Sequence, residues 1–333
     1  MHYRRRIPIT GGIYRPLPIE RYVAILGGGW PIVQELPDGR LGVTTFSWGE
    51  RSLLEFVTSP DGESWSRPTV IASEAVNAAF GVTPDGTLLV TFMRQPYYSD
   101  GIHGPPGESG HPLYICRSYD GGSTWSDEEL AVREGGGEWN VVSPFGKMLT
   151  LPDGTIVMHF YSAGATFLIR SRDNGATWTD QSTIARGEYN ETALCHLGDG
   201  RFIGMMRLKP DGLFQTNSDD GGYTWSEPRR VTGLMEQPGD LIRLRDGRLL
   251  LTYGERVPPF GVQGMISRDE GETWDGEQRL MLAADNTDGG GYPSSVQLED
   301  GTVVTVYYAR GLTSEGGLTI HSSALHYRPE DLP

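Results

Sequence analysis

Five copies of one short polar motif constrain the fold of this chain more than any other feature of its sequence. Four copies share the pattern Ser-x-Asp-x-Gly-x-Thr-Trp, and the fifth is one residue shorter. They lie at 59–65, 118–125, 171–178, 218–225 and 267–274. A motif that recurs at this spacing predicts a fold assembled from similar units, because each unit repeats the same turn.

A second repeat runs in phase with the first and has the pattern of a β-hairpin. Each copy joins two apolar or alternating strands through an Asp-Gly turn, which is a strong hairpin signal. The six copies occupy 30–46, 77–94, 146–161, 191–207, 239–256 and 292–308. After each hairpin except the last follow a third strand, the polar motif and a short fourth strand.

Four strands in about 45 residues is the period of a β-propeller blade. We therefore predict an all-β fold, a six-bladed propeller of four-stranded antiparallel blades, as a single domain over residues 1–333. The last repeat supplies only three strands, so an N-terminal strand is expected to close the ring and leave no open edge. The β-like segment at 3–9 is the candidate for that strand.

The aspartates of the polar motif are interpreted as turn residues and not as catalytic acids. Such an Asp accepts hydrogen bonds from backbone N–H groups of its own turn, and the Gly permits a positive φ. A catalytic residue is needed once, whereas this Asp occurs five times. A calcium-binding loop is the alternative, but the EF-hand spacing and its terminal Glu are absent.

The overall charge limits the partners that this chain can have. It carries 28 Lys and Arg against 43 Asp and Glu, a formal net charge of −15. Such a field repels the phosphates of nucleic acids and of anionic membranes, so neither is expected as a partner.

No stretch approaches the roughly 18 apolar residues of a membrane span. The first ten residues lack the apolar region of a secretory signal, which slightly favours a cytoplasmic location. Cys116 and Cys195 are expected to be buried thiols.

The polar motifs match the Asp-box, or BNR, motif, and with six hairpins the chain resembles the sialidase (neuraminidase) superfamily of six-bladed propellers. Asp boxes also occur in propellers that are not sialidases, so the function has to be argued from site residues. Sialidases bind the substrate carboxylate with three arginines, and they use a Tyr nucleophile, a Glu that activates it and an Asp acid/base. A neutral phenol suits this reaction because a carboxylate nucleophile would be repelled by the carboxylate on the anomeric carbon.

The resemblance extends to particular residues. The fourth hairpin is similar to the sialidase segment with the Glu and one arginine, which implies these roles for Glu191 and Arg207. The fifth hairpin ends where another arginine precedes an Asp box, which implies substrate binding by Arg256. The sixth begins like the Tyr-Ser-Ser segment of the nucleophile, which implies Tyr292. Asn190 either orients Glu191 or caps a turn.

Two positions depart from the sialidase pattern. The first arginine of that pattern lies just before the first hairpin, where this chain has Gly29 and Trp30. Arginines recur where the second strand of a hairpin ends, and Arg94 at such an end is the candidate replacement in substrate binding. The acid/base Asp belongs after the first hairpin, where this chain has Glu50 and no Asp.

The general acid is therefore sought in the long segment 94–112. It offers Asp100, His103, Glu108 and His111, each of which would protonate a leaving oxygen if burial shifted its pKa towards neutrality. Asp100 is taken as the catalytic candidate. His103 and His111 with Asp100 match no strong metal-binding spacing, and no metal or cofactor is expected.

These residues predict a glycoside hydrolase of the sialidase type with a glycan or glycoside as its partner. It would release a terminal acidic sugar, with Arg94, Arg207 and Arg256 on the carboxylate and with Glu191 and Tyr292 in catalysis. Two alternatives stay open. A propeller hydrolase or lyase of shifted specificity would act on a uronic acid or a neutral exo-glycoside. A non-catalytic propeller would only bind carbohydrate or protein.

Overall fold

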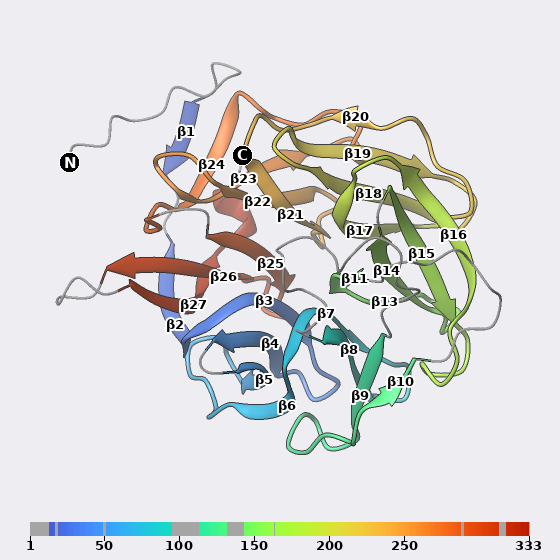
Figure 1. Ribbon diagram of the computed structural model, residues 1–333. Coiled ribbons are helices and arrows are strands. Elements are labelled where there is room, and N and C mark those ends of the chain that lie inside the picture. Colours follow the sequence, from blue (N-terminus) through green and yellow to red (C-terminus); the bar gives the residue numbers. More distant parts are fainter. Residues whose placement is uncertain are drawn as a thin grey trace.

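Six antiparallel sheets surround a central axis in the computed structural model (Figure 1). The structure describes residues 13–16, 19–48, 51–94, 113–131, 143–162, 164–287, 290–312 and 318–332. Within these ranges every regular element is a strand except one 3-10 turn, Pro329–Asp331. The predicted all-β propeller of six blades is confirmed.

Each blade places its first strand nearest to the axis and its fourth strand at the rim. Blade 1 consists of β3 (Gly28–Glu35), β4 (Leu41–Trp48), β5 (Ser52–Ser59) and β6 (Thr69–Ser73). Blade 2 consists of β7 (Ala75–Val82), β8 (Leu88–Arg94), β9 (Tyr114–Ser118) and β10 (Glu129–Leu130), with β12 (Gly146–Lys147) added beside β7. Blade 3 consists of β11 (Ser143–Pro144) and β13 (Leu149–Thr150), which both pair with β14 (Ile156–Ser162), then β15 (Ala165–Ser171) and β16 (Thr179–Arg186).

The second half of the ring follows the same order. Blade 4 consists of β17 (Asn190–Gly198), β18 (Arg201–Leu208), β19 (Gly212–Ser218) and β20 (Arg229–Arg230). Blade 5 consists of β21 (Glu236–Arg243), β22 (Leu249–Glu255), β23 (Gly261–Ser267) and β24 (Gln278–Ala283), with β1 (Ile13–Pro16) outside β24. Blade 6 consists of β25 (Gly291–Gln297), β26 (Val303–Leu312), β27 (Leu318–Tyr327) and β2 (Glu20–Leu26).

Blade 6 closes the ring because it combines three C-terminal strands with one N-terminal strand. β2 runs antiparallel to β27, from the pair Glu20 and His326 to the pair Leu26 and His321. The expectation that an N-terminal strand completes this blade is confirmed, and β2 is the strand that does so. The sequence predicts the segment 3–9 for this role, and that segment lies outside the described residues.

The polar motifs form the turns that follow the third strand of five blades. In blade 4, Ser218 Oγ donates to Asp220 Oδ1 at 2.8 Å and accepts from the backbone N of Gly222 at 3.0 Å. Asp220 also accepts from the backbone N (2.9 Å) and Oγ1 (2.6 Å) of Thr224. These hydrogen bonds lower the pKa of Asp220, and the bond from the Thr224 hydroxyl has the largest effect. The motif aspartates are thus turn residues, as the sequence indicates.

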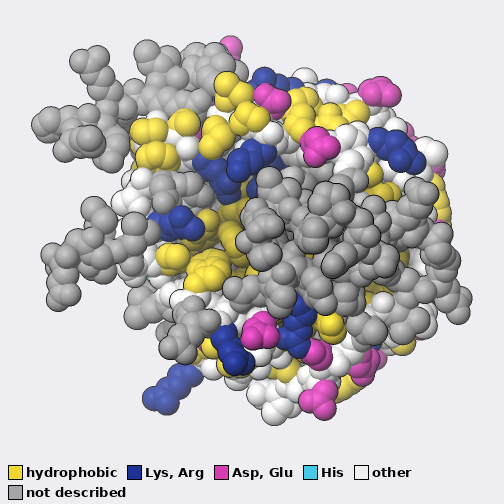
Figure 2. Space-filling view, viewed as in Figure 1, with side chains coloured by type: hydrophobic (Ala, Val, Ile, Leu, Met, Phe, Trp, Pro, Cys, Tyr) yellow, Lys and Arg dark blue, Asp and Glu magenta, His cyan; other side chains and the backbone are white. Residues whose placement is uncertain are grey.

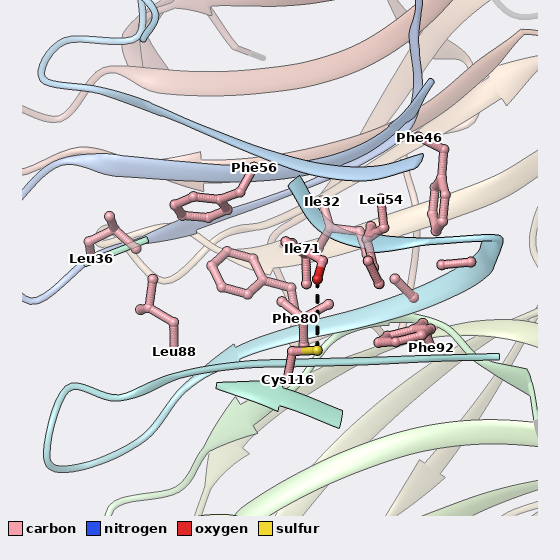
Figure 3. Close-up of a cluster of buried hydrophobic side chains, with 14 residues drawn as sticks. Ile32, Leu36, Phe46, Leu54, Phe56, Ile71, Phe80, Leu88, Phe92 and Cys116 are labelled. Atoms are coloured by element: carbon pink, nitrogen blue, oxygen red, sulfur yellow. Dashed lines mark hydrogen bonds between the residues drawn. The ribbon is translucent and has the colours of Figure 1, made fainter. Parts of the chain in front are cut away.

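Aromatic and aliphatic side chains fill the wedges between neighbouring blades. Figure 3 shows the wedge between blades 1 and 2, where the rings of Phe56 and Phe80 meet edge to face at 5.7 Å. Trp125 of the blade 2 motif packs against Phe56 at 5.2 Å, so the motif also seals the wedge. Cys116 and Cys195 are buried, unpaired thiols, as expected. Among the described residues there is no helix long and apolar enough to cross a membrane.

Trp178, the last residue of the blade 3 motif, tests this role in stability. Its side chain is fully buried in the cluster that joins blades 2 and 3. Trp178→Ala should lower the free energy of unfolding by about 3–5 kcal/mol, because it leaves a large cavity. Urea denaturation measures the loss. Tyr119→Ala, at a motif residue that is 76% exposed, should change stability by less than about 0.5 kcal/mol. Equal losses of unfolding free energy for both variants would contradict the role of Trp178 in packing between the blades.

Candidate functional site

A β-bulge near the start of the innermost strand recurs in five blades. The pairing register shifts after Gly29, Val76, Asn190, Glu236 and Gly291. In four of these bulges a non-glycine residue takes a positive φ, which is uncommon and re-aims the side chain. The four residues are Trp30 (51°), Asn77 (43°), Glu191 (26°) and Tyr292 (51°). Trp30, Asn77 and Tyr292 line one cavity at the axis. Chemically different residues of different blades therefore share one backbone position.

Four of the residues expected in the site form one hydrogen-bonded cluster. The Tyr292 hydroxyl of blade 6 donates to Glu191 Oε1 of blade 4 at 2.9 Å. Arg207 Nη1 donates to the same hydroxyl at 3.1 Å, and Arg207 Nε donates to Asn190 Oδ1 at 2.6 Å. Asn190 faces Arg207 across the hairpin of β17 and β18, which accounts for their contact. The residues implied by the resemblance thus lie together although 101 positions separate Glu191 from Tyr292.

The cluster balances one buried negative charge with one positive charge. The side chain of Glu191 is 5% exposed, and a carboxylate so placed is costly unless it is paired. Its Oε2 forms an ion pair with Arg207 Nη1 but accepts no hydrogen bond from the described residues, so charge alone holds this oxygen. Burial on its own would lower the pKa of Arg207, but the charge of Glu191 together with the neighbouring Tyr292 and Tyr161 raises that pKa overall. Arg207 therefore stays cationic.

Tyr292 is held as a neutral phenol. Burial first and the charge of Glu191 second raise the pKa of the Tyr292 hydroxyl well above its ordinary value. The phenol consequently keeps its proton at neutral pH and directs it at Glu191 Oε1. Such a hydroxyl becomes a nucleophile only when an adjacent base takes the proton, and Glu191 is at the distance required of that base.

Arg256 lies beside the cluster and has no acidic partner among the residues that the structure describes. Its Cζ atom lies 5.0 Å from the centroid of the Tyr292 ring, within the range of a cation–π contact. Its Nε is buried and makes no hydrogen bond within the described ranges. A half-buried guanidinium in this state suits a planar anion such as a carboxylate, which accepts two parallel hydrogen bonds.

Aromatic rings surround Tyr292 on the cavity side. The ring of Trp30 lies 6.0 Å away, that of Phe145 6.1 Å and that of Tyr308 5.7 Å, measured between centroids. Figure 2 shows hydrophobic and basic side chains next to each other to the left of the middle of this face. Sequence reasoning missed Phe145 and Tyr308. The hairpin register offered a signal for Tyr308, because it pairs with Gly291 beside Tyr292.

Asn77 is a further residue that sequence reasoning missed. Its Nδ2 donates to Ser143 Oγ at 2.6 Å and to Tyr161 Oη at 3.0 Å, which links blades 2 and 3 at the cavity. Alignment of the hairpins gives the signal, since Asn77 occupies the bulge that holds Glu191 in blade 4.

An ion pair in the wall of the same cavity connects blades that are distant in sequence. Lys147 Nζ lies 2.8 Å from Asp240 Oδ2 and donates to the backbone oxygen of Ser295 at 2.6 Å. The backbone N of Ser295 donates to Asp240 Oδ2 at 2.7 Å. Since Lys147, Asp240 and Ser295 belong to β12, β21 and β25, this network fixes the spacing of inner strands around the axis.

The remaining expected residues lie elsewhere or outside the described ranges. Arg94 forms an ion pair with Glu128 and lies over the ring of Tyr114 at 5.2 Å, and no described contact joins it to the Glu191 cluster. Asp100, the candidate acid, falls outside the described residues, as do Glu50, His103, Glu108 and His111. Within the described ranges no group of three His, Cys, Asp or Glu side chains is placed to hold a metal ion.

The buried pair of Glu191 and Arg207 yields a test of these electrostatics. Glu191→Gln should destabilise the fold by about 3–5 kcal/mol, because it leaves Arg207 buried without a counter-charge. The double variant Glu191→Gln with Arg207→Met should recover part of that loss in urea denaturation, because neither charge of this pair remains buried. If the double variant loses as much as the sum of the two single variants, the residues do not stabilise each other.

Comparison with known proteins agrees with this fold. A sialidase of Paraclostridium sordellii is 25% identical over 199 residues, which is 50% of this chain and 48% of that protein. A xyloglucanase of a Paenibacillus species is 28% identical over 177 residues, 46% of this chain and 17% of that protein. The chain thus spans half or less of the length of these curated relatives.

A solved structure and a family model extend the comparison to the whole fold. The intramolecular trans-sialidase of Ruminococcus gnavus has the same fold, with a TM-score of 0.72 at 13% identity over 92% of this chain and 95% of that one. The model of the BNR repeat-like domain matches residues 53–305, well over half of the chain. The chain therefore belongs to the BNR repeat-like family, within the sialidase-like superfamily of six-bladed propellers.

Proposed function

We propose that this protein is a glycoside hydrolase that releases a terminal acidic sugar of the sialic acid type from a glycan. The hydrogen bond from Tyr292 to Glu191, next to an arginine without an acidic partner in the described structure, carries the proposal. It supplies a nucleophile, a base and an anion site around one tyrosine side chain. The sialidase relative supports the choice of chemistry.

In the proposed reaction the Tyr292 oxygen attacks the anomeric carbon while Glu191 accepts the phenolic proton. The new bond from oxygen to carbon forms as the glycosidic bond breaks, and the leaving oxygen takes a proton from a general acid. Water then attacks the anomeric carbon and gives its proton to the deprotonated general acid, while the bond from that carbon to the Tyr292 oxygen breaks and Glu191 returns its proton to that oxygen. Arg207 Nη1, 3.1 Å from the Tyr292 oxygen, stabilises the negative charge that develops there when the phenol departs. Asp100 stays the candidate acid from the sequence.

The substrate carboxylate is assigned to Arg256 and to the outer edge of Arg207. Arg207 uses Nε and Nη1 within the cluster, and its Nη2 makes no hydrogen bond to the described residues. Arg94 was expected as the third cation, but its pair with Glu128 leaves this role to the other two. Two arginines bind a carboxylate more weakly than three, so a high KM is expected.

A neutral exo-glycoside is the second candidate substrate. Trp30 occupies the position at which the sialidase pattern has its first arginine, which removes one cation and adds an aromatic face. One relative is a xyloglucanase by name. In this case Glu191 would act directly as acid or nucleophile.

Hydrolysis of a panel of 4-methylumbelliferyl glycosides separates the two candidates. The α-sialoside should be cleaved fastest, ahead of the β-glucuronide, β-galactoside and β-glucoside. Tyr292→Phe and Glu191→Gln should each lower kcat by about 10²–10⁴-fold, because they remove the nucleophile and its base. Arg256→Ala should mainly raise KM, by about tenfold or more, because it removes a charge-assisted contact.

Tyr119→Ala serves as the matched control. It removes an exposed ring outside the cluster of Glu191 and Tyr292 and should leave kcat and KM unchanged. Full activity of Tyr292→Phe would rule out the Tyr nucleophile. Faster cleavage of a neutral glycoside than of the sialoside would favour the second candidate.

A further inference from the structure

We propose that Trp48 and Trp30 form a stacking platform for the ring of a neutral sugar, on the side of the site from which the leaving group departs. The assignment to the leaving-group side rests on the proposed function, because that function places the reacting sugar at Tyr292. The platform itself rests on the geometry of blade 1 alone.

Both tryptophans lie at the end of blade 1 that faces the site. Trp30 is the bulge residue of β3, and Trp48 is the last residue of β4. Their rings meet edge to face at 5.0 Å, and Trp30 is 6.0 Å from the Tyr292 ring. In blades 2, 4 and 5 the same end of the second strand carries or is followed by an arginine. Blade 1 thus presents two indoles where these three blades present cations.

Trp48 can take its position because residue 29 is a glycine, which has no side chain. A Cβ atom added to Gly29 would lie 2.3 Å from Trp48 Cη2, so only a glycine lets the indole lie over β3. The same Cβ position is 3.6 Å from Cδ2 of Tyr308, another ring of the site. Trp48 is therefore packed against the aromatic wall of the cavity, yet 38% of its surface stays exposed.

The chemistry of these surfaces favours a neutral ring. The C–H face of a pyranose packs on an indole while its hydroxyls stay hydrated, and an indole offers a large rigid contact area. A cationic ligand would be repelled by Arg207 and Arg256 beside Tyr292. An anionic ligand would bind to the charged, forked donors of those arginines in preference to an indole, which offers one neutral N–H donor.

The difference in exposure between Trp30 and Trp48 indicates the direction in which a bound glycan would run. Trp30 is half-buried and lines the cavity with Tyr292, whereas Trp48 is exposed. A sugar on Trp48 therefore lies further out than the sugar at Tyr292. In an exo-acting hydrolase that outer ring belongs to the part of the glycan that leaves.

The test measures binding and does not depend on turnover. Lactose, as a neutral disaccharide probe, is titrated into the full chain and into Trp48→Ala, Trp48→Phe and Gly29→Ala, with saturation-transfer NMR as the readout. The wild type should bind lactose. Trp48→Ala should weaken binding at least fivefold, Trp48→Phe should retain part of it, and Gly29→Ala should weaken it because the added Cβ displaces the indole. Tyr119→Ala is the control for loss of an exposed ring and should bind as the wild type does.

A second ligand separates this proposal from the proposed function. Free N-acetylneuraminic acid should bind equally to the wild type and to Trp48→Ala, but at least fivefold more weakly to Arg256→Ala. If the wild type binds lactose but not N-acetylneuraminic acid, the result counts against the acidic substrate and leaves the platform standing. Absence of lactose binding in the wild type, or equal affinity in Trp48→Ala, would overturn the platform.

Discussion

The hydrogen bonds between β2 and β27 are the constraint on which the rest of this structure depends. They join an N-terminal strand to three C-terminal strands, and so they complete blade 6 and close the ring. Tyr292 is in blade 6 and Glu191 is in blade 4, so their contact at 2.9 Å requires every inner strand to keep its distance from the axis. The Lys147–Asp240 ion pair also helps to fix the spacing of the inner strands around the axis. The geometry of the site is therefore a property of the closed ring and not of any one blade.

The repeat separates the residues that hold the blades from those that we propose for the chemistry. The motif aspartates and tryptophans bond within their turns or fill the wedges between blades, as Asp220 and Trp178 illustrate. The bulged residues at the start of the inner strands differ from blade to blade, and two of them, Glu191 and Tyr292, form a hydrogen bond with each other. This division lets a buried ion pair exist at Glu191 without weakening the turns that define the fold.

Most of the architecture could be predicted from the sequence, because hairpins and turns are local and repeat six times. Glu191, Arg207 and Tyr292 could be found since they break the repeat in a recognisable pattern. The closing strand could not be assigned, because the segments at 3–9 and 20–26 both have strand composition and pairing over 300 residues leaves no local signal. Arg94 was expected near the axis from its strand-end position, but its pairing with Glu128 depends on tertiary contacts that no repeat encodes. Phe145 and Tyr308 were missed because an aromatic residue near a strand ordinarily indicates core packing.

The shared bulge also determines how such a protein can change. Its extra residue interrupts the ladder locally, so the pairing on either side does not depend on which side chain stands there. Trp30, Asn77, Glu191 and Tyr292 show that an indole, an amide, a carboxylate and a phenol all fit the same backbone. Each of these four blades thus carries one exchangeable side chain at the same position, and a single codon change can alter its chemistry while the sheets, wedges and turns stay as they are.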